Sequence, residues 1–178
     1  MAMFVLRMDL HAALCQTMRK QGEDRMRKGF ALLAALALAA PATAQTARPM
    51  LDYATAAEMR DACVAYAGEH KVAVAIAIYD DEGRLVTFDL MDGIVNVSSE
   101  LAHWKAKAAM SYRVPSGEMA KWNAANAPGI ATFPGGVPFY TAEGKPLGAI
   151  GVSGSSPDGD LACAKAAVAA AGLKETAS

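Results

Sequence analysis

Residues 72–90 read VAVAIAIYDDEGRLVTFDL, and this stretch decides the fold class. Val72–Tyr79 is a continuous apolar run rich in β-branched residues, which predicts a buried strand. Asp80–Gly83 has the composition of a turn. Residues 84–90 alternate, with one side formed by Leu85, Thr87 and Asp89 and the other by Val86, Phe88 and Leu90. The two runs are therefore predicted to pair as an antiparallel hairpin.

The rest of the chain predicts a second hairpin and several helices. Val137–Thr141 and Pro146–Ser153 flank a Glu143-Gly144 turn. Helices are expected over about 55–69 with Thr55 as cap, 100–113 after Ser98 or Ser99, 118–125, and after Ser156, with Pro157 at the first position and Gly172 near the end. Local hairpins with flanking helices predict an α/β (α+β) domain, with about five antiparallel strands.

The amino-terminal part of the chain has the pattern of an export signal. Met26-Arg27-Lys28 precedes the apolar stretch 29–40, and Pro41 and the Ala42-Thr43-Ala44 cleavage site follow. The stretch is shorter than the roughly 20 residues that a membrane-spanning helix needs. We therefore expect a signal peptide at 26–44, a leader at 45–52, a domain at 53–178, and a translation start at Met26 that makes 1–25 an upstream extension.

Removal of residues 1–44 sets the charge and the cysteine content of the mature protein. These residues hold six Lys or Arg and three Asp or Glu, so 11 basic and 15 acidic residues remain and the net charge is −4. A mildly acidic chain without a basic stripe argues against nucleic-acid binding. Cys63 and Cys163 are the remaining cysteines, either as two buried thiols or as a bridge between first and last helices that lie side by side.

The candidate ligand residues are few. His70 and His103 are the histidines of the mature chain, and no paired spacing predicts a zinc site. His103 lies off the helix face formed by Leu101, Trp104 and Ala108, two turns before Met110. Two turns rise roughly 10–11 Å, so His103 and Met110 cannot both bind one iron. Asp92 and Lys105 are an alternative acid/base group.

Three stretches in order carry a family resemblance. They are VAIAIYD at 74–80 with Gly83 and Leu85-Val86; Met91-Asp92-Gly93 followed by Ser98 and Lys105-Ala106; and Pro134-Gly135-Gly136-Val137-Pro138 with Gly144 and GAIGVSG at 148–154. Together they resemble the GlcG/HbpS-like haem-binding family, which includes the C-terminal domain of PduO. The resemblance covers roughly residues 53–172. It implies a profilin-like sheet with helices on both faces, homo-oligomers, and binding of haem or another tetrapyrrole.

Three hypotheses follow from the residues and the resemblance. The first is an exported, periplasmic or secreted haem-binding protein that is not an enzyme and is not inserted in a membrane. Its pocket would lie near the Gly135-Gly136 loop and the 98–112 helix, with Lys105 and Met110 nearby. His103 and His70 are ligand candidates from side-chain chemistry, because the family shares no single ligand motif. The others are an enzyme or small-molecule binder using Asp92 and Lys105, and an assembly module without a ligand.

Overall fold

The computed structural model describes residues 18–21, 25, 46–124 and 126–177, and divides the chain into a unit over 1–47 and a unit over 48–178. The predicted signal peptide at 26–44 lies outside the described residues. Within the described part of the chain, no helix has both the length and the apolar character needed to cross a membrane. The second unit is the folded domain described below.

One antiparallel sheet forms the centre of the domain. Its strands β1 (Ala75–Asp80), β2 (Leu85–Leu90), β3 (Gly136–Tyr140) and β4 (Pro146–Ser153) lie in the order β2-β1-β4-β3, and each neighbouring pair is antiparallel. Both predicted hairpins are confirmed. There are four strands rather than about five, because the further pairing found within 46–124 and 126–177 is a single bridge between Tyr140 and Lys174.

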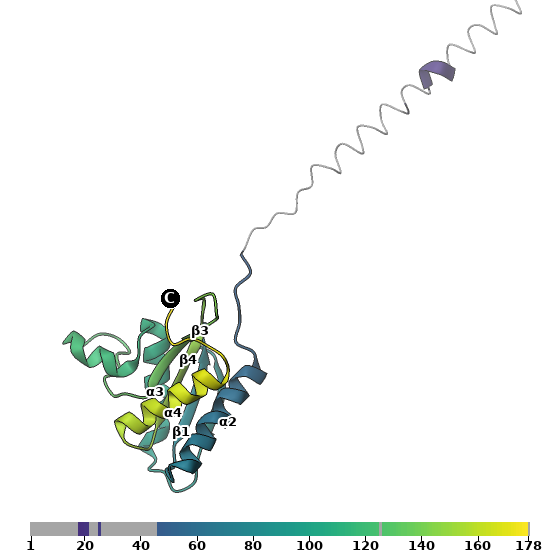
Figure 1. The fold of residues 1–178 in the computed structure, drawn as a ribbon. Coiled ribbons are helices and arrows are strands. Elements are labelled where there is room, and N and C mark those ends of the chain that lie inside the picture. Colours follow the sequence, from purple (N-terminus) through teal and green to yellow (C-terminus); the bar gives the residue numbers. More distant parts are fainter. Residues whose placement is uncertain (1–17, 22–24, 26–45, 125, 178) are drawn as a thin grey trace, which may run out of the picture. The chain divides into compact units, whose positions relative to one another are not determined.

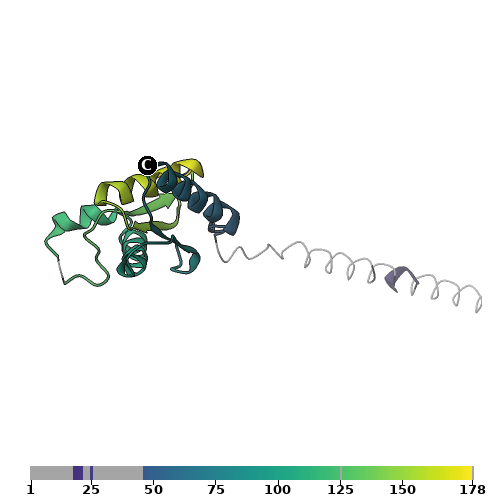
Figure 2. The same cartoon turned by 90° about the horizontal axis from the view of Figure 1, so that it is seen from below.

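Helices cover both faces of this sheet. Helices α2 (Tyr53–Glu69) and α4 (Pro157–Ala170) lie side by side on one face, and α3 (Val97–Tyr112) lies on the other (Figures 1 and 2). Strand alternation explains the two layers. Ile76 and Ile78 of β1 pack with α2 and α4 in the large core, whereas Ala77 and Tyr79 pack with α3. The predicted fold with helices on both faces is confirmed.

Several local predictions differ from the structure. Asp52 rather than Thr55 caps α2, because the Asp52 carboxylate accepts the Thr55 backbone N–H at 2.7 Å. The predicted short helix over 118–125 is a 3₁₀ helix, η1, over Ser116–Trp122. Strand β1 starts at Ala75 and continues through Asp80, whose side chain is buried and accepts hydrogen bonds from the following turn.

A disulfide joins the two helices that share a face. Cys63 of α2 and Cys163 of α4 are bridged, with their Cα atoms 5.0 Å apart. The bridge closes a loop of 100 residues, for which the chain-entropy model gives about 4–5 kcal/mol of stabilisation. Of the two alternatives left open by the sequence, the structure therefore shows the bridge.

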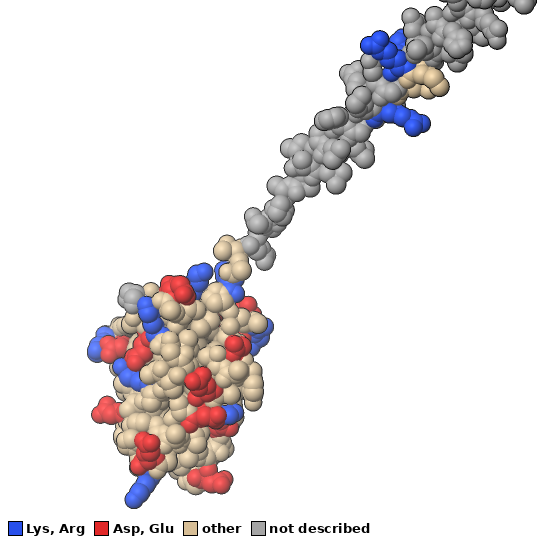
Figure 3. Space-filling model, turned by 45° about the vertical axis from the view of Figure 1, so that its right-hand side comes forward, with Lys and Arg blue, Asp and Glu red and all other residues tan. Residues whose placement is uncertain are grey.

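Charges are dispersed on the α2 side of the domain. Figure 3 shows acidic and basic side chains interspersed over that face, separated by wide neutral areas. The visible face carries no continuous basic patch of the kind that binds a phosphate backbone.

Candidate functional site

Helix α3 approaches the sheet closely, and this approach positions the site. Its sheet-facing side is formed by small residues, including Ala102 and Ala106. A Cβ atom at Gly151 of β4 would collide with the Ala102 carbonyl oxygen and would lie 2.6 Å from the Ala106 backbone nitrogen. Because glycine has no Cβ, the helix backbone rests directly on the strand.

His103 lies half-buried on α3, next to Tyr79 and Phe88. Its Nδ1 is 2.9 Å from the Tyr79 hydroxyl oxygen. The Phe88 ring stacks on the imidazole, with the ring centroids 4.5 Å apart and the planes 26° from parallel, and Tyr79 meets it edge-on with centroids 5.8 Å apart. The imidazole is thus held by a hydrogen bond and by two aromatic contacts.

Burial lowers the pKa of His103 below its usual value, and the positive charge of Lys107 lowers it further, against the opposing charge of Glu100. The ring is therefore neutral at neutral pH. A neutral imidazole has one nitrogen that carries a proton and one that carries a lone pair. His103 can consequently act as a metal ligand without first losing a proton.

Partly buried apolar side chains from β2, the following loop and α3 pack on the same side of the sheet as His103. Phe88, Ile94 and Met110 are partly buried against the same small cluster of α3 and β1 residues. The Lys107 ammonium lies 5.4 Å from the centroid of the Tyr79 ring. We call the set formed by Phe88, Ile94, His103, Lys107 and Met110 the α3–β2 surface. It offers a lone pair, apolar area and one cation.

His70 lies on the other layer of the domain. It follows α2, is exposed, and stacks on Tyr66 with the ring centroids 3.9 Å apart. Its Nδ1 is 2.8 Å from the Tyr66 carbonyl oxygen. Because α2 and α3 cover opposite faces of the sheet, His70 and His103 of one chain do not share a site.

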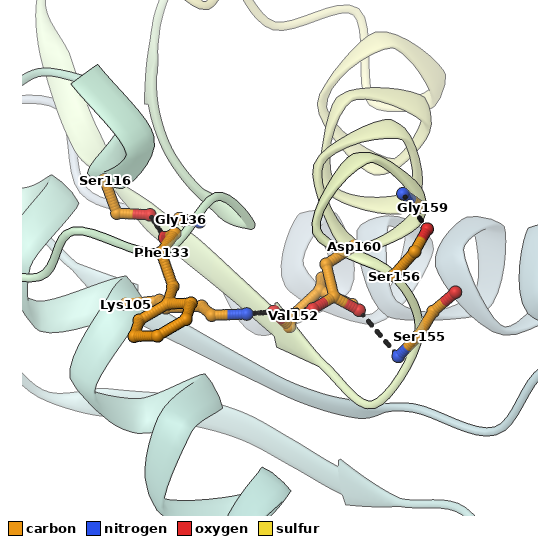
Figure 4. A network of polar contacts seen from close by, with 9 residues as sticks. All are labelled: Lys105, Ser116, Phe133, Gly136, Val152, Ser155, Ser156, Gly159 and Asp160. Atoms are coloured by element: carbon orange, nitrogen blue, oxygen red, sulfur yellow. Dashed lines mark hydrogen bonds and ion pairs between the residues drawn. The ribbon is translucent and has the colours of Figure 1, made fainter. Parts of the chain in front are cut away.

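Lys105 is buried in an ion pair that the sequence did not reveal (Figure 4). Its Nζ donates to Asp160 Oδ2 at 2.8 Å and to the Val152 carbonyl oxygen at 2.9 Å. Asp160 Oδ1 also accepts the Ser155 backbone N–H at 2.9 Å. Burial raises the pKa of Asp160, while the hydrogen bond and the charge of Lys105 oppose that rise. The pair joins α3 to the first turn of α4.

Gly135 and Gly136 lie against Lys105. A Cβ at Gly135 would lie 3.1 Å from Lys105 Nζ, and one at Gly136 would collide with the Lys105 carbonyl oxygen. The Gly136 backbone N–H donates to Ser116 Oγ at 2.9 Å (Figure 4). The glycines permit close packing of α3 against β3.

The alternative acid/base group is not assembled. Asp92 lies exposed in the turn after β2, whereas Lys105 is buried and its carboxylate partner is Asp160. Met110 packs over the β1–β2 turn, where its Cε would be 3.7 Å from a Cβ at Gly83. Across 46–124 and 126–177, no group of three or more His, Cys, Asp or Glu side chains is placed to hold a metal ion.

Comparison with known proteins agrees with this architecture. A family model described as "Haem degrading protein HbpS-like" matches residues 51–169. This chain belongs to the HbpS-like family. The resemblance inferred from its motifs is confirmed.

Solved structures share the HbpS-like fold. A PduOC–haem complex superposes with a TM-score of 0.67 at 25% identity, covering 72% of this chain and 99% of that one. A double mutant of HbpS from Streptomyces reticuli superposes with a TM-score of 0.66 at 32% identity, covering 74% of this chain and 94% of that one.

A curated relative is the corrinoid adenosyltransferase PduO of Citrobacter freundii, which is 33% identical over 153 residues. The match covers 77% of this chain and 44% of PduO, so this chain spans less than half of that protein.

Sequence reasoning identified His103 in this HbpS-like domain but missed the residues that hold it. Alternation along β1 places Tyr79 on the same side as Ala77, yet it does not say which helix covers that side. Asp160 reads as a residue that favours the positive end of a helix, because acidic residues are common there. Its pairing with Lys105, 55 positions earlier, has no local signal.

Proposed function

We propose that this protein is an exported, non-catalytic haem-binding protein that takes part in haem sensing, storage or scavenging. The observation that carries the proposal is the environment of His103. A neutral imidazole, oriented by Tyr79 and Phe88, lies in the partly buried apolar α3–β2 surface. The family membership and the haem complex of PduOC support the haem-binding part of the proposal.

The residues of the α3–β2 surface suit the chemistry of haem. Haem, when bound, would supply an iron atom that accepts a neutral imidazole nitrogen as a ligand. Phe88, Ile94 and Met110 offer apolar contacts to a macrocycle, and Lys107 offers a cation to a carboxylate of the ligand. His103 is therefore the residue that would hold the iron according to the geometry.

One observation favours His70 as the second candidate. A carbonyl oxygen only accepts hydrogen bonds, so the contact with Tyr66 requires the proton on Nδ1 of His70 and leaves the lone pair on its Nε2. The ring is exposed, however, and a haem bound there would need further apolar cover.

Export and self-association are part of the same proposal. A disulfide between Cys63 and Cys163 suits an oxidising compartment such as the periplasm or the extracellular medium. Leu90, Val95 and Val97 are each more than half exposed, and association of copies over these side chains would remove them from water. N-terminal sequencing of exported protein and light scattering of the purified protein test these two parts.

Hemin titration tests the binding function. The Soret band is followed for the wild type, His103→Ala and His70→Ala, with the melting temperature as a control for folding. We expect saturable binding by the wild type and a loss of the histidine-ligated spectrum in His103→Ala. No saturable change in the wild type would contradict haem binding, and a spectrum that survives both substitutions would contradict both ligand assignments. Turnover of hemin by substoichiometric protein, with reductant and oxygen present, would contradict the non-catalytic role.

A further inference from the structure

We infer that Tyr79 is a positioning residue for the iron ligand, because its hydroxyl oxygen accepts the Nδ1–H of His103 and leaves Nε2 as the donor to iron. The inference rests on the proposed function and names the residue that would fix the tautomer and the orientation of His103. It is carried by the contact between the two side chains and by the rigidity of the strand that holds Tyr79.

Tyr79 is fixed in the centre of the domain. It belongs to β1, which pairs with both β2 and β4, and its backbone lies opposite Leu85 on one side and Ala149 on the other. The residue is 5% exposed. A buried residue in an inner strand loses little freedom when it makes a further contact, so the hydroxyl is a preorganised partner.

The hydrogen bond decides which nitrogen of His103 is available. Among the contacts of the described residues, Nδ1 is the ring nitrogen with a hydrogen-bond partner. A nitrogen that binds iron must carry a lone pair, so the proton of the neutral ring must then be on the other nitrogen. With the proton on Nδ1, the Tyr79 oxygen accepts it and Nε2 is the ligand. The contact also increases the electron donation of the ring.

Phe88 completes the orientation. It stacks on the face of the imidazole, while Tyr79 meets the ring edge-on, so rotation of the ring would break an aromatic contact as well as the hydrogen bond. Tyr79 and Phe88 come from neighbouring strands, whereas His103 comes from α3. The arrangement therefore depends on the docking of the helix on the sheet.

A buried tyrosine hydroxyl also needs a partner for structural reasons, so the test must separate the two roles. Tyr79→Phe removes the hydroxyl and keeps the ring. Tyr140→Phe is the matched control, because Tyr140 is 4% exposed, belongs to the same sheet, and donates its hydroxyl to the Arg113 carbonyl oxygen at 3.1 Å, away from His103. Both substitutions remove one partly buried hydrogen bond.

The experiment combines hemin affinity with resonance Raman spectroscopy of the reduced, five-coordinate haem complex. We expect Tyr79→Phe to bind hemin about 10-fold more weakly, at the lower end of the range for loss of a ligand's hydrogen-bond partner. We also expect its iron–imidazole stretching frequency to fall, because the imidazole donates less strongly. Tyr140→Phe should match the wild type in both measurements. A Tyr79→Phe variant with wild-type affinity and frequency would overturn the inference.

The outcomes distinguish this inference from the proposed function. Failure of the wild type to bind hemin overturns both, whereas binding that His103→Ala leaves intact overturns the assignment of His103 and with it the role of Tyr79. If Tyr79→Phe does not fold, ¹⁵N NMR of the histidine ring in the wild-type protein decides. A proton on Nδ1 of His103 supports the inference, and a proton on Nε2 overturns it.

Discussion

Replacement of Lys105 by methionine should cost the domain about 3–5 kcal/mol of unfolding free energy, the usual loss when one partner of a buried ion pair is removed. The side chains of Lys105 and Asp160 are 3% and 4% exposed. Methionine keeps most of the aliphatic length, but it leaves the Asp160 carboxylate and the Val152 carbonyl oxygen without the donor that lies 2.8 and 2.9 Å away. The loss is therefore electrostatic rather than a loss of volume.

The size of the effect can be measured by thermal unfolding. The unit over residues 48–178 has about 130 residues, for which the average entropy of unfolding gives roughly 0.27 kcal/mol per degree. A loss of 3–5 kcal/mol thus lowers the melting temperature by about 11–18 °C. Burial raises the folded-state pKa of Asp160 above the reference value of 3.8, and removal of Lys105 raises it further. The stability that Asp160 contributes falls as pH rises from 3.8 through its folded-state pKa. The loss of unfolding free energy caused by Lys105→Met should therefore be smaller at pH 4 than at pH 7.

A double-mutant cycle isolates the pair. Asp160→Asn keeps an oxygen that can accept the Ser155 N–H, and the variant with both substitutions contains no unpaired buried charge. We expect the double variant to lose at least about 1 kcal/mol less than the sum of the single losses. Lys121→Met is the control, since the Lys121–Glu118 pair is exposed and should change stability by less than about 0.5 kcal/mol. A Lys105→Met loss below about 1 kcal/mol, or additive single losses, would refute the reasoning.

Three further predictions concern the same domain. Cys63→Ser should lower the free energy of unfolding by about 4–5 kcal/mol, and reduction of the wild type should have the same effect in denaturant titrations. An unchanged midpoint of the denaturant titration would argue against the bridge. Gly151→Ala should lower the free energy of unfolding by about 3 kcal/mol, because the added Cβ meets the α3 backbone. Gly68→Ala is the control: no atom lies within 4 Å of the added Cβ, so it should stabilise α2 by about 0.5 kcal/mol. Equal melting temperatures of the two variants would contradict this prediction. Burial opposes ionisation of Asp80, but hydrogen bonds from Arg84 outweigh it and lower the pKa, so this stabilisation is present above pH 3.8 and is lost as pH falls toward the folded-state pKa. Asp80→Asn should therefore cost roughly 1.5 kcal/mol at pH 7 and progressively less below pH 4, and a pH-independent deficit would exclude the ionic explanation.

Local patterns were sufficient for most of the fold. The apolar run 72–79, the alternation over 84–90 and the Glu143-Gly144 turn each contain the period or the turn residues of the element they form. Cap positions were less predictable. Thr55 was expected to cap α2, whereas the Asp52 side chain does so, because two adequate capping residues near one helix start compete and packing selects between them.

For the candidate site, the sequence predicted some of the residues and the tertiary structure determined their partners. Sequence chemistry alone selected His103 and His70 as ligand candidates and Lys105 with Asp92 as an alternative acid/base group, and the ordered motifs identified the family. Only the tertiary structure shows that Lys105 is buried against Asp160 and that Tyr79 contacts His103. It also shows that the two histidines lie on opposite faces of the sheet. The periodicity of a strand or helix depends on residues that are close in the chain, so it can be recognised in the sequence. Contacts across 24 or 55 positions exist only once the glycines of the sheet let α3 dock against the strands.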